Sequence, residues 1–262
     1  MTIHTKHDPG MFSWTDLGTT DPAAAKKFYA EIFGWTFADM PMGESGIYTM
    51  CKRGEHAAAA ITELNDVQKS FGAPPHWTCY FTVADIDAAT AKVVPAGGKL
   101  VAGPFDVMDA GRMSVVDDPT GAGVALWQPK KHIGAGITSA HGAITWAELL
   151  TRDVEVARKT WTGIFGWGTD SMPMPNGVSY TIFKVGDVPS CGMMPMPSQV
   201  PAQVPSHWLP YFQVDDCDAT LKKTTDLGGK IVVPAIEAPT IGRFATLMDP
   251  QGAAFAVLQP KR

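Results

Sequence analysis

The apolar positions near the N-terminus follow first a strand-like and then a helical pattern. Residues 12–19 form a strand-like run that leads directly into Asp21-Pro22. An N-cap Asp accepts hydrogen bonds from the first turn, and Pro at the first helical position lacks only a donor that would be unpaired there. Phe28 begins an apolar stripe at helical spacing, and Gly34 is placed to end the helix. The pattern therefore predicts a strand followed by a helix.

The next segments predict more strands and then the same order of elements again. Strand-like runs cover residues 46–52 and 57–62. A second piece has the same order, with a strand over 77–83, a helix over 85–94, and strands over 112–116 and 123–128 that an Asp-Pro-Thr-Gly turn joins. The predicted unit is β-α-β-β-β.

The whole chain is also an internal duplication. The segment DPAAAKKFYAEIFGW at 21–35 returns as DVEVARKTWTGIFGW at 153–167, an offset of 132 residues. Four further motifs return at an offset of 131 residues, namely His-Trp, Gly-Gly, Gly-Arg and Asp-Pro-x-Gly. The chain therefore carries four units, and we expect an N-terminal domain over 1–130 and a C-terminal domain over 131–262.

Each unit is too small to bury both faces of its own sheet. The helix covers one face, and a second unit must meet the other, so paired units enclose a cleft. The helix start D-P-x-x-A-x-x-F-Y with F-G-W, the Gly-Gly before a strand and the D-P-x-G before the last strand resemble the vicinal oxygen chelate superfamily. That superfamily includes glyoxalase I, bleomycin-resistance proteins and extradiol dioxygenases. The resemblance implies an α+β fold of four βαβββ modules that form two homologous domains, as in the four-module glyoxalase-like or hydroxylase-like members. It leaves open whether adjacent or swapped modules pair.

The resemblance also implies where metal ligands should stand. Metal-dependent members place one ligand on the first strand of each module and a carboxylate on a last strand. Those positions fall on residues that do not make a ligand set for a divalent ion, namely Trp14, Thr78, Ala125, Trp146, Leu209 and Ala256. We therefore expect no bound metal and no other cofactor.

Alternation along the strands predicts which side chains share each cleft. Asp16 and His76 share the parity of the implied ligand positions, and so do Glu148 and His207. If the first strands run antiparallel, Asp16 and His76 lie opposite each other, because their numbers give the sum of 92 that Trp14 and Thr78 give. A carboxylate beside a histidine is a candidate general base. The alternative is that each histidine only fastens the start of its strand.

Other residues are candidates for binding a ligand. Aromatic side chains on the predicted cleft faces offer flat apolar surfaces with one polar group each, namely Trp14, Tyr80, Trp127, Trp146 and Tyr211. Arg112 and Arg243 each follow a glycine and are candidates for an anionic substrate group. The alternative is that each pairs with a neighbouring carboxylate, Asp109 in the first case.

Composition narrows the class of partner. The net charge is −5 and no basic cluster is longer than Lys130-Lys131, so we expect a small-molecule ligand and no nucleic acid. No apolar stretch approaches the roughly 18 residues of a membrane span, and the N-terminus is polar, so we expect a cytoplasmic monomer or homodimer with four free thiols. Three functions fit: a metal-independent enzyme or binding protein, a metal-dependent lyase or oxygenase with displaced ligands, and a sequestering protein that does not catalyse.

Overall fold

The computed structural model describes residues 1–174 and 177–261 and contains the four predicted modules. The first two are β2 (Phe12–Thr19), α1 (Pro22–Phe33), β3 (Thr36–Pro41), β4 (Ile47–Arg53) and β5 (His56–Glu63), then β6 (His76–Thr82), α3 (Ile86–Ala91), β7 (Lys99–Val107), β8 (Gly111–Asp117) and β9 (Gly123–Pro129). The other two are β11 (Ile144–Thr151), α4 (Val154–Phe165), β12 (Gly168–Pro173), β13 (Ser179–Val185) and β14 (Val188–Pro195), then β15 (His207–Gln213), α5 (Cys217–Asp226), β16 (Lys230–Ala238), β17 (Gly242–Met248) and β18 (Ala254–Pro260). Short elements outside the modules are β1 (Thr2–Ile3), η1 (Gly43–Ser45), α2 (Asp66–Ser70) and β10 (Ile137–Thr138).

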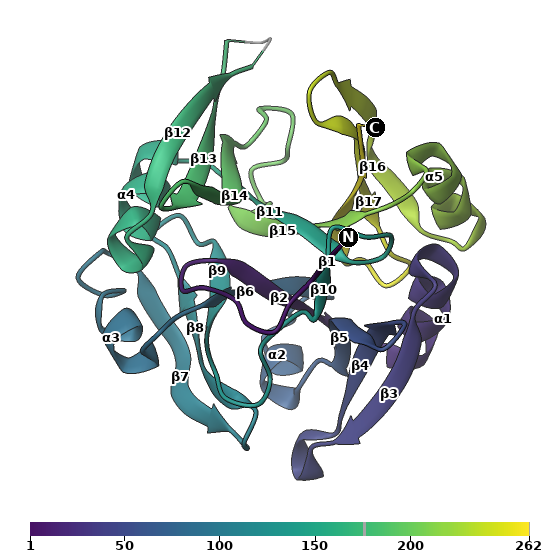
Figure 1. Ribbon diagram of the computed structural model, residues 1–262, viewed down its shortest axis with the longest axis horizontal. Helices are drawn as coiled ribbons and strands as arrows, with labels where there is room; N and C mark the ends of the chain where they lie inside the picture. Colours follow the sequence, from purple (N-terminus) through teal and green to yellow (C-terminus); the bar gives the residue numbers. More distant parts are fainter. Residues whose placement is uncertain (175–176, 262) are drawn as a thin grey trace.

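Adjacent modules pair, which settles the question that the sequence leaves open. The first sheet has the strand order β3-β4-β5-β2-β6-β9-β8-β7, and the second has β12-β13-β14-β11-β15-β18-β17-β16. In each sheet the first strands of the two modules, β2 with β6 and β11 with β15, lie at the centre and run antiparallel. Figure 1 shows the two sheets as separate halves of the molecule with helices at their outer sides. The predicted α+β fold of two homologous domains is confirmed.

The long helices begin and end as their sequences predict. Asp21 accepts a hydrogen bond from the backbone N–H of Ala24 at 2.9 Å, and Gly34 ends α1 in the left-handed region with φ of 65°. In α4 the equivalent cap is Asp153, and Gly166 ends the helix at φ of 70°. The repeated segments 21–35 and 153–167 therefore form the same helix with the same caps.

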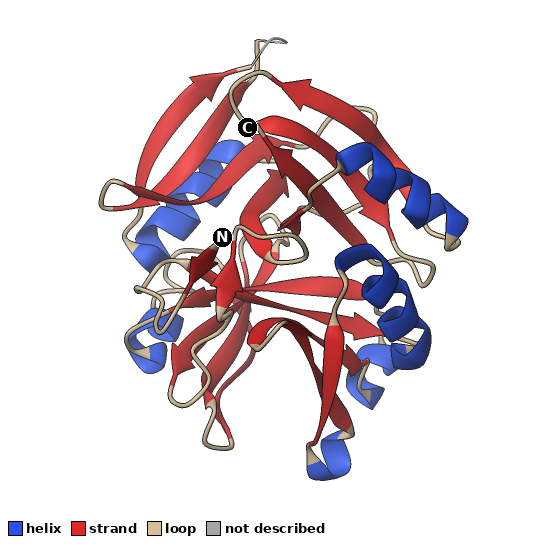
Figure 2. Cartoon of the chain, turned by 45° about the vertical axis from the view of Figure 1, so that its right-hand side comes forward, coloured by secondary structure: helices blue, strands red, loops and turns tan. Residues whose placement is uncertain are grey.

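The two domains are joined through the Asp of each D-P-x-G turn. One oxygen of Asp118 holds its own turn, and Oδ2 accepts a hydrogen bond from the indole of Trp161 in α4 at 3.0 Å. Asp249 does the same with its own turn, and its Oδ2 accepts from the hydroxyl of Tyr29 in α1 at 3.0 Å. Figure 2 shows the consequence, with the helices of the two domains side by side, α1 next to α5.

All four cysteines are free, as predicted, and all four are buried. No helix in the described residues is long and apolar enough to cross a membrane.

Candidate functional site

The central strand β2 divides its side chains between the helix-covered face and the opposite face of the first sheet. A bulge between Phe12 and Trp14 sets the register at the start of the strand. Trp14 and Asp16 then share one face, with exposed fractions of 2% and 7%. Because a strand alternates its side chains, this is the face that the sequence pattern assigns to both residues.

The predicted contact between Asp16 and His76 was wrong in register. Asp16 pairs with Thr78 across the ladder, and His76 pairs with Gly18. Nδ1 of His76 donates to the carbonyl oxygen of Pro74 at 2.8 Å, so the ring fastens the start of β6. Shifting one strand of an antiparallel pair by two residues changes the sum of the paired residue numbers by two and keeps every side chain on its face. Alternation therefore predicted the face correctly and could not fix the partner.

Asp16 has two tyrosines as partners instead. Tyr80 Oη donates to Oδ2 of Asp16 at 2.7 Å, and Tyr48 Oη donates to the same oxygen at 3.1 Å. The indole N–H of Trp14 donates to Tyr48 Oη at 3.0 Å. Strands β2, β4 and β6 thus supply a continuous chain of hydrogen bonds, the first network, which ends on one carboxylate.

Burial controls the electrostatics of this carboxylate. Removal from water raises the pKa of Asp16, and the hydroxyls of Tyr80, Tyr48 and Thr78 and the charge of His76 each oppose that rise in part. The phenol of Tyr80 has its own pKa raised well above its usual range, first by burial and then by the charge of Asp16. Both tyrosines therefore stay protonated, and Asp16 is the group in this network that can change its charge.

The second sheet carries the same arrangement, which we call the second network. Tyr180 Oη and Tyr211 Oη each donate to Glu148 at 2.9 Å, and the indole of Trp146 donates to Tyr180 Oη at 2.9 Å. Burial raises the pKa of Glu148, and the two tyrosine hydroxyls oppose that rise. One difference is visible in the bonds: Tyr180 uses Oε1 and Tyr211 uses Oε2, so both oxygens are engaged separately.

The predicted contact between Glu148 and His207 was wrong for the same reason. Glu148 pairs with Leu209, and His207 pairs with Leu150. Nδ1 of His207 donates to the carbonyl oxygen of Pro205 at 2.9 Å. The structure therefore brings both carboxylates together with tyrosines and leaves both histidines at strand starts.

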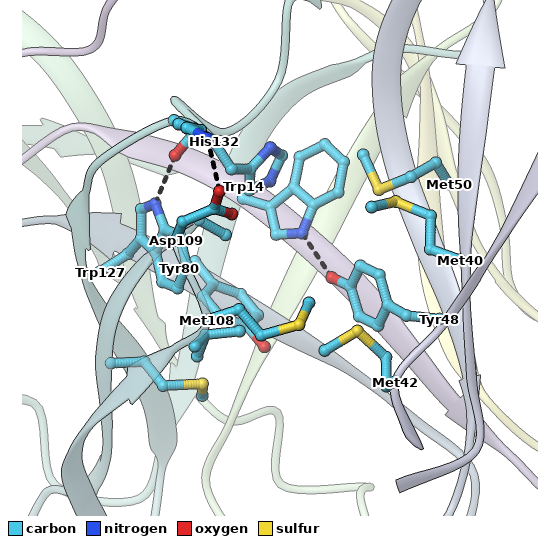
Figure 3. A pocket seen from close by; sticks show the side chains of 14 residues that line it. Trp14, Met40, Met42, Tyr48, Met50, Tyr80, Met108, Asp109, Trp127 and His132 are labelled. Atoms are coloured by element: carbon cyan, nitrogen blue, oxygen red, sulfur yellow. Dashed lines mark hydrogen bonds and ion pairs between the residues drawn. The ribbon is translucent and has the colours of Figure 1, made fainter.

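The first network lies beside a cavity of about 280 Å³. Figure 3 shows Tyr48 on one side with methionines around it, and Trp127 and His132 on the opposite side. Its lining residues are mostly apolar and come from both modules and the interdomain linker: Trp14, Met40, Met42, Tyr48, Met50, Tyr80, Val107, Met108, Asp109, Ala110, Met113, Trp127, Lys131 and His132. Of these, Trp14, Tyr80 and Trp127 were predicted as ligand-binding residues. We call this cavity the first cleft.

Two important residues were missed by the sequence analysis. Tyr48 has a detectable signal, because Tyr48-Thr49 returns as Tyr180-Thr181 at the offset of 132 residues. His132 has no such signal, because it lies on the linker between the repeats. Its ring packs edge-on against Trp14 with centroids 4.6 Å apart.

His132 closes one wall of the first cleft. Its carbonyl oxygen accepts from the indole of Trp127 at 2.9 Å, and its backbone N–H donates to Ala110. Burial lowers the pKa of His132 to about 4, with a smaller contribution from His7. The ring is therefore neutral near pH 7. Beside it, Lys131 and Asp109 form an ion pair of 2.5 Å.

The predicted role of the two arginines in binding an anion does not fit the structure. Arg112 bonds to Asp87 of α3 through two nitrogens, at 2.5 and 3.1 Å, rather than to Asp109. Arg243 bonds to Asp218 of α5 at 2.8 Å. Both side chains therefore lie on the helix-covered faces, away from the networks.

Two of the three implied metal positions of each sheet lie in one row across its centre, with a tyrosine between them. The third position, Thr78 or Leu209, lies instead opposite the carboxylate of its network. In the first sheet Trp14 pairs with Tyr80, and Tyr80 pairs with Ala125. In the second sheet the row is Trp146, Tyr211 and Ala256. Indole and methyl groups offer no ligand atom. Across residues 1–174 and 177–261, no group of three or more His, Cys, Asp or Glu is placed to hold a metal ion.

Comparisons with known proteins agree with the fold and the duplication. Residues 11–126 match the family model described as the Glyoxalase/Bleomycin resistance protein/Dioxygenase superfamily. A protein of Mycobacterium tuberculosis named "Putative glyoxylase CFP32" is 43% identical over 99% of this chain and 98% of its own length. The anthracycline biosynthesis protein DnrV of Streptomyces peucetius is 35% identical over 97% of this chain and 95% of its own length.

Solved structures with low sequence identity share the fold. The Mn(II)-bound glyoxalase of Novosphingobium aromaticivorans superposes with a TM-score of 0.64 at 15% identity, covering 96% of this chain and 82% of that one. The 2,3-dioxygenase LapB of Pseudomonas sp. KL28 gives 0.64 at 14% identity, covering 97% and 94%. With the near full-length relatives, these likenesses show that the chain belongs to the glyoxalase/bleomycin resistance/dioxygenase superfamily.

Proposed function

We propose that the protein binds a flat, uncharged organic molecule in the first cleft and moves a proton on it through Asp16 and Tyr80, without a metal ion. The observation that carries this proposal is the first network: a buried carboxylate with a raised pKa, held by two tyrosines that line an apolar cavity. Pockets of this type bind ligands through apolar walls and a few placed polar groups.

The chemistry of the donor set supports the metal-free part of the proposal. A divalent ion on this fold needs several oxygen or nitrogen ligands around one point. The central row of the first sheet offers Trp14, Tyr80 and Ala125, and the nearby Asp16 already accepts two phenolic hydrogens on one oxygen. These residues do not fit a divalent ion, so no step of the proposal passes through one.

The network provides a route for a single proton. When Asp16 is protonated, its proton passes to Tyr80 Oη while Tyr80 gives its own proton to an oxygen of the ligand. When Asp16 is ionised, the same two transfers run in reverse. The raised pKa of Asp16 brings this carboxyl closer to neutral pH, where a general acid or base works best. In a keto–enol interconversion this route would supply the proton on oxygen, and the proton on carbon would leave to water.

The walls of the cleft support a flat ligand without charge. Trp14 and Trp127 offer aromatic faces, the methionines adapt their shape, and the ion pair of Lys131 with Asp109 leaves no unpaired charge at this edge. The volume of about 280 Å³ lies near the lower end of the range for ligand pockets, which favours two or three fused rings. The anthracycline biosynthesis relative is consistent with a polycyclic aromatic ligand.

Binding of emodin, an uncharged hydroxyanthraquinone of three rings, tests this proposal by isothermal titration calorimetry. We expect saturable binding in the first cleft that Trp127→Leu weakens about tenfold, because the substitution removes an aromatic face from the wall of the cleft. The exposed Phe71→Ala is the control and should leave emodin binding unchanged. Absence of binding, or binding that Trp127→Leu does not affect, would contradict the proposal.

A further inference from the structure

The second network has an apolar surface around it that does not belong to the main core. Leu209, Tyr211 and Ala256 form a separate buried cluster. Partly buried apolar side chains surround this cluster: Trp146, Leu150, Phe244, Ala254 and Leu258. The first-sheet equivalents of Trp146, Tyr211 and Leu258 are Trp14, Tyr80 and Trp127. These three are each less than 9% exposed and belong to the main core. The same part of the fold is thus closed in one domain and more open in the other.

The difference has a visible cause in the linker. His132 packs against both Trp14 and Trp127 and so covers one side of the first cleft. Within residues 1–174 and 177–261, no aromatic or histidine ring packs against Trp146 in this way. An indole with its N–H engaged and its surroundings partly exposed is an apolar surface that a ligand can cover.

The polar groups on the two surfaces are nearly the same. Each has an indole that donates to a tyrosine, and two tyrosines that donate to a buried carboxylate. A polar group of a ligand that suits one network therefore suits the other. The bulk that each surface accepts is different, because only the first is closed by His132.

We propose that the second network and its apolar surround form a second binding site, for a bulkier molecule of the same hydroxylated aromatic class, which is bound there and not converted. The inference rests on the proposed function of the first cleft for the class of ligand. Binding without conversion follows from Glu148, whose two oxygens are each occupied by one tyrosine. It follows also from Leu209, which replaces the hydroxyl that Thr78 offers to Asp16.

Two probes that share one anthraquinone and differ by a glucosyl group test the inference on the full chain. Emodin is small enough for both sites, and emodin 8-O-glucoside carries a sugar that the first cleft has no room for. Calorimetry should give two emodin sites and one glucoside site per chain. Trp146→Ala should weaken glucoside binding at least tenfold, and Trp14→Ala should leave it within twofold. Tyr211→Phe, a milder change, should weaken the glucoside about three- to tenfold while circular dichroism shows the fold intact.

The outcomes separate this inference from the proposed function. One emodin site that only Trp14→Ala removes, with no glucoside binding, would overturn the second site and leave the proposed function standing. Glucoside binding that Trp14→Ala removes and Trp146→Ala does not would also overturn it. Glucoside binding that Trp146→Ala removes, with no emodin in the first cleft, would support the second site and overturn the proposed function. No binding of either probe would overturn both.

Discussion

The two domains carry the same hydrogen-bond network on surfaces that differ in closure. In the first domain Trp14 is 2% exposed and packs under His132, and Asp16 takes both tyrosine hydroxyls on Oδ2. In the second domain Trp146 is only partly buried, and Glu148 takes one hydroxyl on each oxygen. Both domains retain the hydrogen-bond network, and the residues that cover the network differ. The comparison teaches that the linker residue His132, together with changed module positions such as Trp127 and Leu258, distinguishes the two sites.

The largest expected difference between the domains concerns catalysis. For a compound that the first cleft converts, Asp16→Asn should lower turnover by about 10²–10⁴-fold, the usual contribution of a general acid or base. Glu148→Gln, the matched change in the second network, should leave turnover within twofold. Initial rates for both variants and the wild type provide the measurement. Equal losses from the two variants would break the comparison.

The sequence predicted the helix ends and the four modules because these features depend on local motifs that occur in both halves of the chain. The Asp caps and the glycines at the ends of α1 and α4 lie where the motifs place them. The predicted unit requires strands at the places of β3 and β7, but their residue ranges were not predicted, because each lies at an edge of the first sheet and has few buried side chains to mark a period.

The candidate site was predicted in part, for reasons that differ from residue to residue. Trp14 and Asp16 were assigned to the right face because alternation fixes the face of a strand. The predicted partner of Asp16 was wrong, because alternation allows the two paired strands to shift by two residues without changing any face. Only the three-dimensional packing of the side chains makes Tyr80, and not His76, the hydrogen-bond donor to Asp16. His132 lies outside the repeat, so comparison of the two halves could not reveal it.

The next largest effect should fall on the contacts that join the two domains. Tyr29→Phe and Trp161→Phe each leave the buried carboxylate of Asp249 or Asp118 without its donor from the other domain. We expect each change to lower the free energy of unfolding by about 1–3 kcal/mol, and Trp161→Phe to cost more because it also leaves a cavity. Urea denaturation provides the measurement, with the exposed Phe71→Ala as a control. Loss in one variant alone would show that the two interdomain contacts are unequal.

A smaller effect should appear in the first domain alone as acid is added. The neutral form of His132 is favoured in the folded state, because burial lowers its pKa from 6.5 to about 4. The unfolded chain therefore binds more protons in that window, and the stability that this residue contributes is lost as the pH falls from about 6.5 to about 4. His132→Phe should remove that part of the loss. Unfolding curves at several pH values should show a flatter acid side for the variant, and identical slopes would refute the assignment.

The smallest effect should be shared by the two carboxylates and have the opposite sign. Burial raises the pKa of Asp16 and of Glu148, so the folded state binds more protons than the unfolded chain just above the usual carboxyl range. Their contribution to stability is present at low pH and is lost as the pH rises through the raised values. The variant with both Asp16→Asn and Glu148→Gln should lose less stability over that rise. A wild type and double variant with parallel curves would contradict this account.

Carbon-13 NMR of the carboxyl groups tests the central claim most directly. The side-chain signals of Asp16 and Glu148 can be assigned by their loss in Asp16→Asn and Glu148→Gln, and then followed while emodin is added at constant pH. The account predicts that the Asp16 signal moves as the first cleft fills, in the wild type and in Glu148→Gln alike. An Asp16 signal that stays unchanged at saturating emodin would contradict the claim that this carboxylate is the reactive group of the first cleft.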